Sequence, residues 1–152
     1  MISSVIGSLR TKRNQLVNAI EGLSTEQLTT IPKGFNNNIL WNFGHIIVSQ
    51  QLLCYAKANV PLQIPSALVD SFKKASSPAD WTSPIDVETL KALALSTVDA
   101  FEADLKAEKF NNYEAYMTSA GLELQNINDA IMYSYHHEGY HAGVIFALKT
   151  IL

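Results

Sequence analysis

Cysteine is nearly absent from this chain of 152 residues, which contains only Cys54. A single thiol cannot form an internal disulfide, so we expect the fold to depend on a hydrophobic core, for which this length suffices. Cys54 is expected about 180° away from His45 on the same helix, too far round for the two side chains to share a ligand. We therefore interpret Cys54 as a small buried apolar side chain and not as a nucleophile.

Three further absences narrow the class of protein. The longest apolar runs, at residues 46–48 and 143–148, are far shorter than the roughly 20 residues of a membrane helix. The net charge of −3, with scattered lysines, provides no basic surface for nucleic acid. The first residues contain no basic segment before an apolar block, so no signal peptide is indicated. We expect a cytoplasmic protein that binds neither membranes nor nucleic acid.

Strand-like alternation and repeats are also missing, whereas helical periodicity is present along most of the chain. Apolar residues recur at helical spacing within residues 2–23, 38–59, 86–106 and 121–152. Ser24 and Asp86 are expected to cap helices that follow them. The sequence therefore predicts an all-α fold, a four-helix bundle that forms one domain over residues 1–152.

The connections between these helices differ in length. Residues 29–38 contain Pro32, Gly34 and three asparagines, which is typical of turns. The connection between the second and third helices, at residues 61–84, is long and rich in proline, with a short helix expected near residues 66–74. Long connections in compact domains are usually functional, so we expect this one to form a lid or a pocket wall.

The fourth helix contains two histidines at the spacing of metal ligands. His137 and His141 lie about 40° apart on a helical wheel, on the apolar face, whereas His136 falls to the side. A pair of buried imidazoles needs hydrogen-bond partners or a metal ion. On this helix alone, two hydrogen-bonded core histidines and a metal site are both possible.

A third histidine lies at the centre of the apolar face of the second helix. Trp41, His45 and Val48 follow the spacing i, i+4, i+7. Three inward imidazoles on facing helices predict a site for a divalent metal ion, with zinc or nickel preferred, formed by His45, His137 and His141.

Two other polar residues are candidates for substrate binding. Arg13 interrupts the apolar face of the first helix, either as a side chain that snorkels at the edge or as an anion-binding group that faces a cavity. Ser134 precedes His137 by one turn and could orient a bound ligand. Glu138 lies beside the histidines and not between them, so we identify no general base and assign no catalytic residue.

The back of the fourth helix is apolar as well. We expect this face to pack either against the long connection or against a second copy of the chain, as a homodimer. Its residues are Met132, Tyr135, Gly139, Ala142, Gly143 and Phe146.

Two segments resemble a known family. They are NILWNFGHI at residues 38–46 and HEGYHAGVI at residues 137–145, the second with a His-x-x-x-His-x-Gly pattern. The chain resembles the DinB-like superfamily, also described as YfiT-like metal-dependent hydrolases, along nearly its whole length. The resemblance implies a bundle of up-down-down-up topology, a frequent dimer, and a zinc- or nickel-type site at His45, His137 and His141.

The resemblance also suggests a reaction. Characterised relatives include transferases and isomerases that use mycothiol or bacillithiol. Because no general base is evident, we expect a metal-dependent transferase that joins a low-molecular-weight thiol to a small electrophile. The alternatives are a metal-dependent hydrolase and a non-catalytic, dimeric metal-binding protein of the stress response. DNA repair, suggested only by the family name, lacks a basic surface here.

Overall fold

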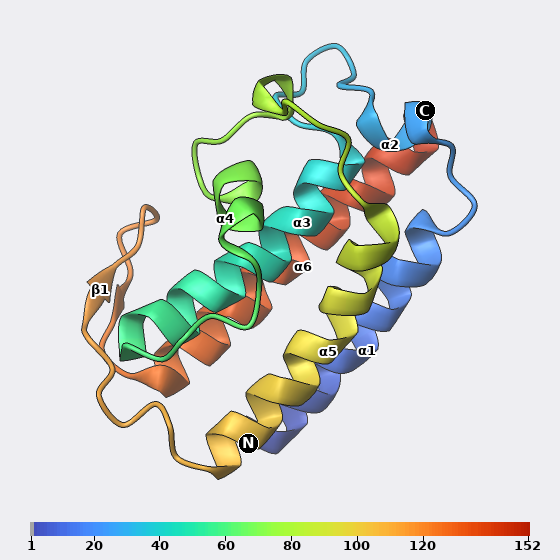
Figure 1. Cartoon of the computed structure of the whole chain (residues 1–152). Coiled ribbons are helices and arrows are strands. Elements are labelled where there is room, and N and C mark those ends of the chain that lie inside the picture. Colours follow the sequence, from blue (N-terminus) through green and yellow to red (C-terminus); the bar gives the residue numbers. More distant parts are fainter. Residues whose placement is uncertain (1) are drawn as a thin grey trace.

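Four long helices dominate the computed structural model, which describes residues 2–152 (Figure 1). They are α1 (Ile2–Ile20), α3 (Ile39–Gln50), α5 (Val87–Lys106) and α6 (Ile127–Ile151). The all-α prediction is confirmed. Within residues 2–152, no helix combines the length and the hydropathy needed to cross a membrane.

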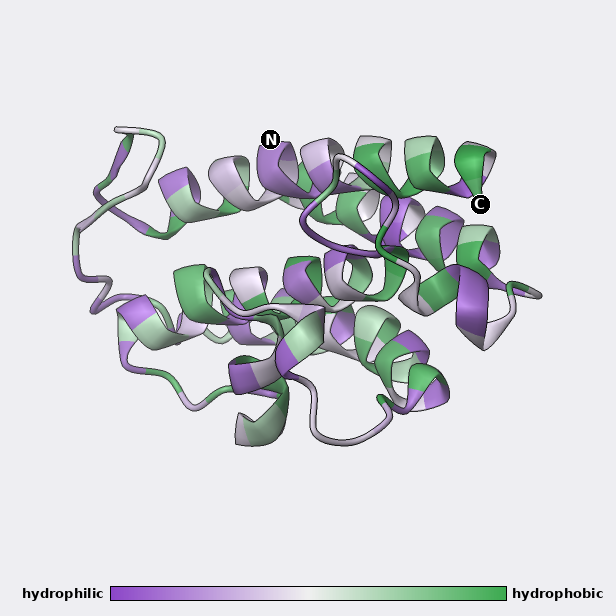
Figure 2. Cartoon of the chain, turned by 90° about the horizontal axis from the view of Figure 1, so that it is seen from above, coloured by the Kyte–Doolittle hydropathy of each residue, from purple (hydrophilic) through white to green (hydrophobic). Residues whose placement is uncertain are grey.

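Hydrogen bonds and ion pairs between the helices give their relative directions. α6 runs parallel to α1 and antiparallel to α3, whereas α5 runs antiparallel to α1. In chain order the long helices therefore run up, down, down and up (Figure 1). Hydrophobic and hydrophilic residues alternate along them, as expected for amphipathic helices (Figure 2).

The predicted helix starts are formed by side-chain caps. Ser24 and Gln27 form a capping box at the start of α2 (Thr25–Thr29), and Asp86 accepts a hydrogen bond from the backbone N–H of Thr89 at the start of α5. Asn38 caps α3 in the same way, by accepting from the N–H of Trp41. These caps fix where the helices begin.

The second predicted helix reaches its expected length but changes its winding. α3 continues into the π-helical turn η1 (Gln51–Tyr55) and the 3-10 turn η2 (Ala56–Ala58), and ends at Asn59 in the left-handed region. Hydrophobic periodicity did not locate this change, because a single π-helical turn is too short to establish a period of its own.

The long connection contains α4 (Ser66–Phe72) and the 3-10 turn η3 (Pro78–Asp80). α4 packs closely on α3 at Gly44, where an added Cβ would lie 2.4 Å from the ring of Phe72. Since Phe72 is fully buried, glycine is required at this position for α4 to approach so closely.

The sequence prediction is wrong at the segment before the last helix. A small antiparallel hairpin, β1 (Tyr116–Met117) and β2 (Glu123–Leu124), lies where no strand was expected. The helix begins at Ile127, after the cap residue Asn126, and not near residue 121. Two-residue strands are too short to produce a detectable alternation of apolar and polar residues.

A polar layer crosses the hydrophobic core and separates it into two clusters. One cluster surrounds Leu16 and Ile145, and the other surrounds Leu9 and Phe101. Arg13 lies between them on α1, and it is completely buried. The histidines are found beside this layer, at the contact between α3 and α6.

Candidate metal centre

The structure brings together the three histidines that the sequence selected. His45 comes from α3, and His137 and His141 come from successive turns of α6. One ring nitrogen of each lies within 4.8 Å of the others. Helical spacing placed two of the rings on one face, and the antiparallel contact between α3 and α6 supplies the third.

Two of the imidazoles are oriented by hydrogen bonds on the side away from the cluster. His45 Nδ1 lies 2.6 Å from the carbonyl oxygen of Phe72, and His141 Nδ1 lies 2.8 Å from Oδ1 of Asn42. Both oxygens only accept hydrogen bonds, so both Nδ1 atoms must donate. The Nε2 atoms therefore present lone pairs to the interior of the cluster, as metal-binding histidines require.

Asn42 is itself held in place, and its role escaped the sequence analysis. Its Nδ2 donates to the backbone carbonyl of Asn38 at 2.7 Å, which leaves its Oδ1 free to accept from His141. The cap of α3 thus fixes the orientation of a histidine on α6. An amide at residue 42, inside the apolar segment 39–48, was the available signal.

The distance between the two histidines of α6 suits a metal ion. His137 Nε2 lies 3.2 Å from His141 Nε2. With a proton on His137 Nε2 this contact is a hydrogen bond, and with the proton on Nδ1 both lone pairs face one point. Two nitrogens bound tetrahedrally at about 2.0–2.1 Å are about 3.3 Å apart, so this pair of histidines fits such an ion.

The electrostatics of the cluster keep the imidazoles neutral. Burial, followed by the neighbouring histidines, lowers the pKa of His137 to about 4 and that of His141 to about 3. Burial also lowers the pKa of His45. Neutral imidazole is the form that binds metals, so near neutral pH no proton has to be displaced.

A pocket of about 240 Å³ opens beside the histidines. His45 and His137 form part of its wall, together with residues of η1, the hairpin and the turn after α4. The long connection therefore contributes to a pocket wall, through Lys74, as expected. The full lining is His45, Ser49, Leu52, Leu53, Lys74, Tyr116, Thr118, Ser119, Tyr133 and His137.

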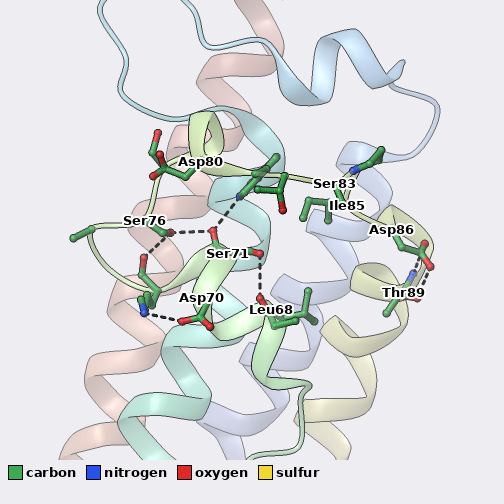
Figure 3. A pocket seen from close by; sticks show the side chains of 16 residues that line it. Leu68, Asp70, Ser71, Ser76, Asp80, Ser83, Ile85, Asp86 and Thr89 are labelled. Atoms are coloured by element: carbon green, nitrogen blue, oxygen red, sulfur yellow. Dashed lines mark hydrogen bonds and ion pairs between the residues drawn. The ribbon is translucent and has the colours of Figure 1, made fainter.

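A larger cavity of about 680 Å³ lies between α4, η3 and the start of α5 (Figure 3). None of the three histidines lines it. Some of its polar groups bond to one another: Ser76 donates to the carbonyl of Ser71, and Thr89 donates to Asp86. Because it contains none of the histidines, we assign no chemistry to this cavity.

Arg13 does not snorkel, so that expectation is wrong. It is fully buried and donates from Nε and Nη2 to Glu138, at 2.8 and 2.5 Å. It also donates to the backbone carbonyls of Ile46 and Ala94 and to the side-chain oxygen of Gln50. The sequence missed this pairing because the two residues are 125 positions apart.

Ser134 also lies away from the pocket. It is 2% exposed, and its Oγ is 3.8 Å from Sγ of Cys54. Cys54 is buried as expected, and burial raises the pKa of its thiol to about 12. Neither Arg13 nor Ser134 lines the pocket beside the histidines.

The back of α6 is only partly as expected. His136 is exposed and lies outside the cluster. Ala142 is buried, and the ring of Tyr135 lies under Lys12 Nζ. Met132 and Phe146 remain 50% and 46% exposed. The expectation that this face packs against the long connection is therefore wrong.

An all-α fold with three convergent histidines defines a helical protein with a site positioned to bind a metal ion. The model of the DinB superfamily matches residues 8–145, and the chain belongs to this superfamily. No curated protein matches the sequence.

Proposed function

We propose that the protein binds one divalent ion, zinc or nickel, through His45, His137 and His141 and transfers a low-molecular-weight thiol to a small electrophile. The observation that carries this proposal is the convergence of three histidine nitrogens beside an open pocket, whose wall includes His45 and His137. A structural zinc site would instead be closed by four protein ligands.

The composition of the cluster favours a catalytic over a structural ion. It contains three histidines and no carboxylate among its members. Glu138, which follows His137 in the chain, accepts hydrogen bonds from Arg13 instead. A divalent ion held by three imidazoles supplies a Lewis acid that lowers the pKa of a thiol. The protein then needs mainly to bind both reactants close together.

In the proposed reaction the thiol sulfur forms a bond to an electrophilic carbon. The bond from that carbon to its leaving group breaks, the leaving group departs with the bonding electrons, and the thiol proton passes to water. Leu52 and Leu53 provide an apolar wall for the electrophile. Ser49 Oγ lies 3.2 Å from His45 Nε2, where its hydroxyl can donate to the incoming sulfur.

Hydrolysis is less well supported by the same pocket. A hydrolase needs a general base to activate water, and its usual carboxylate would have to lie beside the histidines. Among residues 2–152, no aspartate or glutamate lines this pocket. This composition supports thiol transfer over the hydrolase alternative.

The test is an assay of untagged, metal-loaded protein with 1-chloro-2,4-dinitrobenzene and, in turn, bacillithiol, mycothiol and glutathione. We expect turnover with at least one thiol, loss of turnover after metal removal, and recovery on adding zinc or nickel. The matched control is His136→Ala, which removes an imidazole outside the cluster. Metal-loaded protein that turns over no thiol would support the non-catalytic alternative.

We also propose a homodimer formed through the exposed face of α6. Met132, Tyr140 and Phe146 are exposed on this helix, with Gly139 and Gly143 between them, so a second helix can approach closely. Sedimentation should find a dimer for the wild type and a monomer for Phe146→Glu. The control Met117→Glu changes an exposed apolar residue outside α6 and should stay dimeric. A monomeric wild type would contradict the proposal.

A further inference from the structure

We propose that Lys74 binds the carboxylate of the ligand that occupies the pocket beside the histidines, so that the ligand is a small anion. This inference rests on the proposed function and adds the substrate class: a thiol that carries a carboxylate a few atoms from its sulfur. Its basis is the distribution of charge and hydroxyl groups around the pocket.

Lys74 is the one formally charged side chain among the residues that line the pocket. The two histidines in the lining are neutral, and no aspartate or glutamate of residues 2–152 accompanies them. A divalent ion at the histidines adds further positive charge. The potential in the pocket is therefore positive on both sides, which favours an anionic ligand and disfavours a cationic one.

Lys74 is free to pair with a ligand. Within residues 2–152 it forms no ion pair, whereas its neighbour Lys73 pairs with Asp70 at 2.7 Å. Lys73 lines the larger cavity and not the pocket beside the histidines. The two adjacent lysines thus differ in their surroundings, although they have the same chemistry.

The turn that carries Lys74 is tied to the histidine cluster. The backbone N–H of Ser76 donates to the carbonyl of Lys73 at 3.1 Å, and Ser76 Oγ accepts from Trp41 Nε1 at 2.9 Å. The ring of Trp41 is stacked on His45, with 4.4 Å between the ring centroids. The backbone at Lys74 therefore keeps a fixed position relative to the nitrogens that face the pocket.

Hydroxyl groups of the lining can complete the binding of a carboxylate. Thr118 Oγ1 accepts a hydrogen bond from the backbone N–H of Leu122, so its own proton remains available for a ligand. Thr118 is buried, and Ser119, Tyr116 and Tyr133 add further hydroxyls to the wall. Donors of this kind, combined with one cation, are typical of carboxylate sites.

The experiment uses three thiols with the same two-carbon spacing and different charge. They are 3-mercaptopropionate, 2-mercaptoethanol and cysteamine, which carry a carboxylate, a hydroxyl and an ammonium group. Binding to the cobalt-loaded protein is followed by the thiolate-to-cobalt charge-transfer absorption. Each thiol is compared between the wild type, Lys74→Met and the control Lys73→Met, so that differences in thiol acidity cancel.

We expect Lys74→Met to lower the affinity for 3-mercaptopropionate about three- to tenfold. The affinity for 2-mercaptoethanol should stay unchanged, and that for cysteamine should rise. Lys73→Met should change none of these affinities. Equal effects of Lys74→Met on all three thiols, or the same pattern in Lys73→Met, would overturn the role of Lys74 and leave thiol binding intact.

A different result separates the two proposals. If no thiol produces the charge-transfer absorption, the proposed function fails, and the role of Lys74 is then measured by calorimetry with glutarate and 1,5-pentanediol. Binding of glutarate that is lost in Lys74→Met would still support an anion site. Equal binding of the two compounds, or none, would overturn it.

Discussion

Two polar clusters lie in the interior of this bundle, and α6 contributes one of two adjacent residues to each. Glu138 points to the buried Arg13, and His137 points to the pocket. In the first cluster, Arg13 donates to a carboxylate and to backbone carbonyls of α3 and α5. In the second, ring nitrogens with available lone pairs face a cavity.

The difference between the clusters separates structure from function. The hydrogen bonds of Arg13 and Glu138 join α1, α3, α5 and α6, so this pair fixes the arrangement of all four long helices. Its charges are already paired and shielded from water, so it has little to offer a ligand. The histidines are oriented from behind, by Asn42 and the carbonyl of Phe72, and keep their reactive sides open.

The largest expected effect comes from breaking the closed cluster. Glu138→Ala leaves the guanidinium of Arg13 buried without a counter-ion, which should lower the free energy of unfolding by about 3–5 kcal/mol. The double variant Arg13→Met, Glu138→Leu should recover much of this loss, because it leaves no unpaired charge. Urea denaturation measures both, and wild-type stability in Glu138→Ala would contradict a buried ion pair.

Breaking the open cluster should affect metal binding instead. His141→Ala removes a ligand, and its metal affinity should fall by more than the ~10–100-fold typical for loss of an orienting partner. His136→Ala should bind the metal ion with wild-type affinity, since that side chain lies outside the cluster. Metal content after dialysis and competitive titration measure the affinity. A larger loss in His136→Ala would mean that a different histidine binds.

A smaller effect is expected where α4 packs on α3. Gly44→Ala places a methyl group against the ring of Phe72 and should cost about 1–3 kcal/mol of stability. Metal affinity should fall as well, because the carbonyl of Phe72 orients His45. The control Gly7→Ala meets no atom within 4 Å and should be neutral or slightly stabilising. Equal stability of the two variants would show that α4 is not tightly packed.

The smallest effect is that of pH on metal affinity. Because the pKa values of His137 and His141 in the folded protein are about 4 and 3, no proton competes between pH 7 and 5, and affinity should change little. The unfolded chain does take up protons below about pH 6.5, so the stability of the metal-free protein should fall as pH decreases from there toward 4. Metal titration and urea denaturation at pH 7, 6 and 5 check both. A steep loss of affinity at pH 6 would mean ordinary histidine pKa values.

The positions of the long helices and the three candidate metal ligands could be predicted from local sequence patterns. Caps such as Asp86 and the apolar period located the four long helices, and His45, His137 and His141 were selected because a helix returns each face to the core every three to four residues. The hairpin at residues 116–124 was missed because its strands are too short for any period to appear. The buried state of Arg13 was missed because its partner lies on another helix.

The sequence by itself determined the helical class and the identity of the three histidines, because helix geometry converts spacing along the chain into a common face. Tertiary structure alone decided which polar groups meet across the bundle: Arg13 with Glu138, His45 with the carbonyl of Phe72, and Lys74 with the pocket. These contacts join segments that are distant in the chain. They depend on how the helices and the long connection pack in three dimensions, which no local pattern encodes.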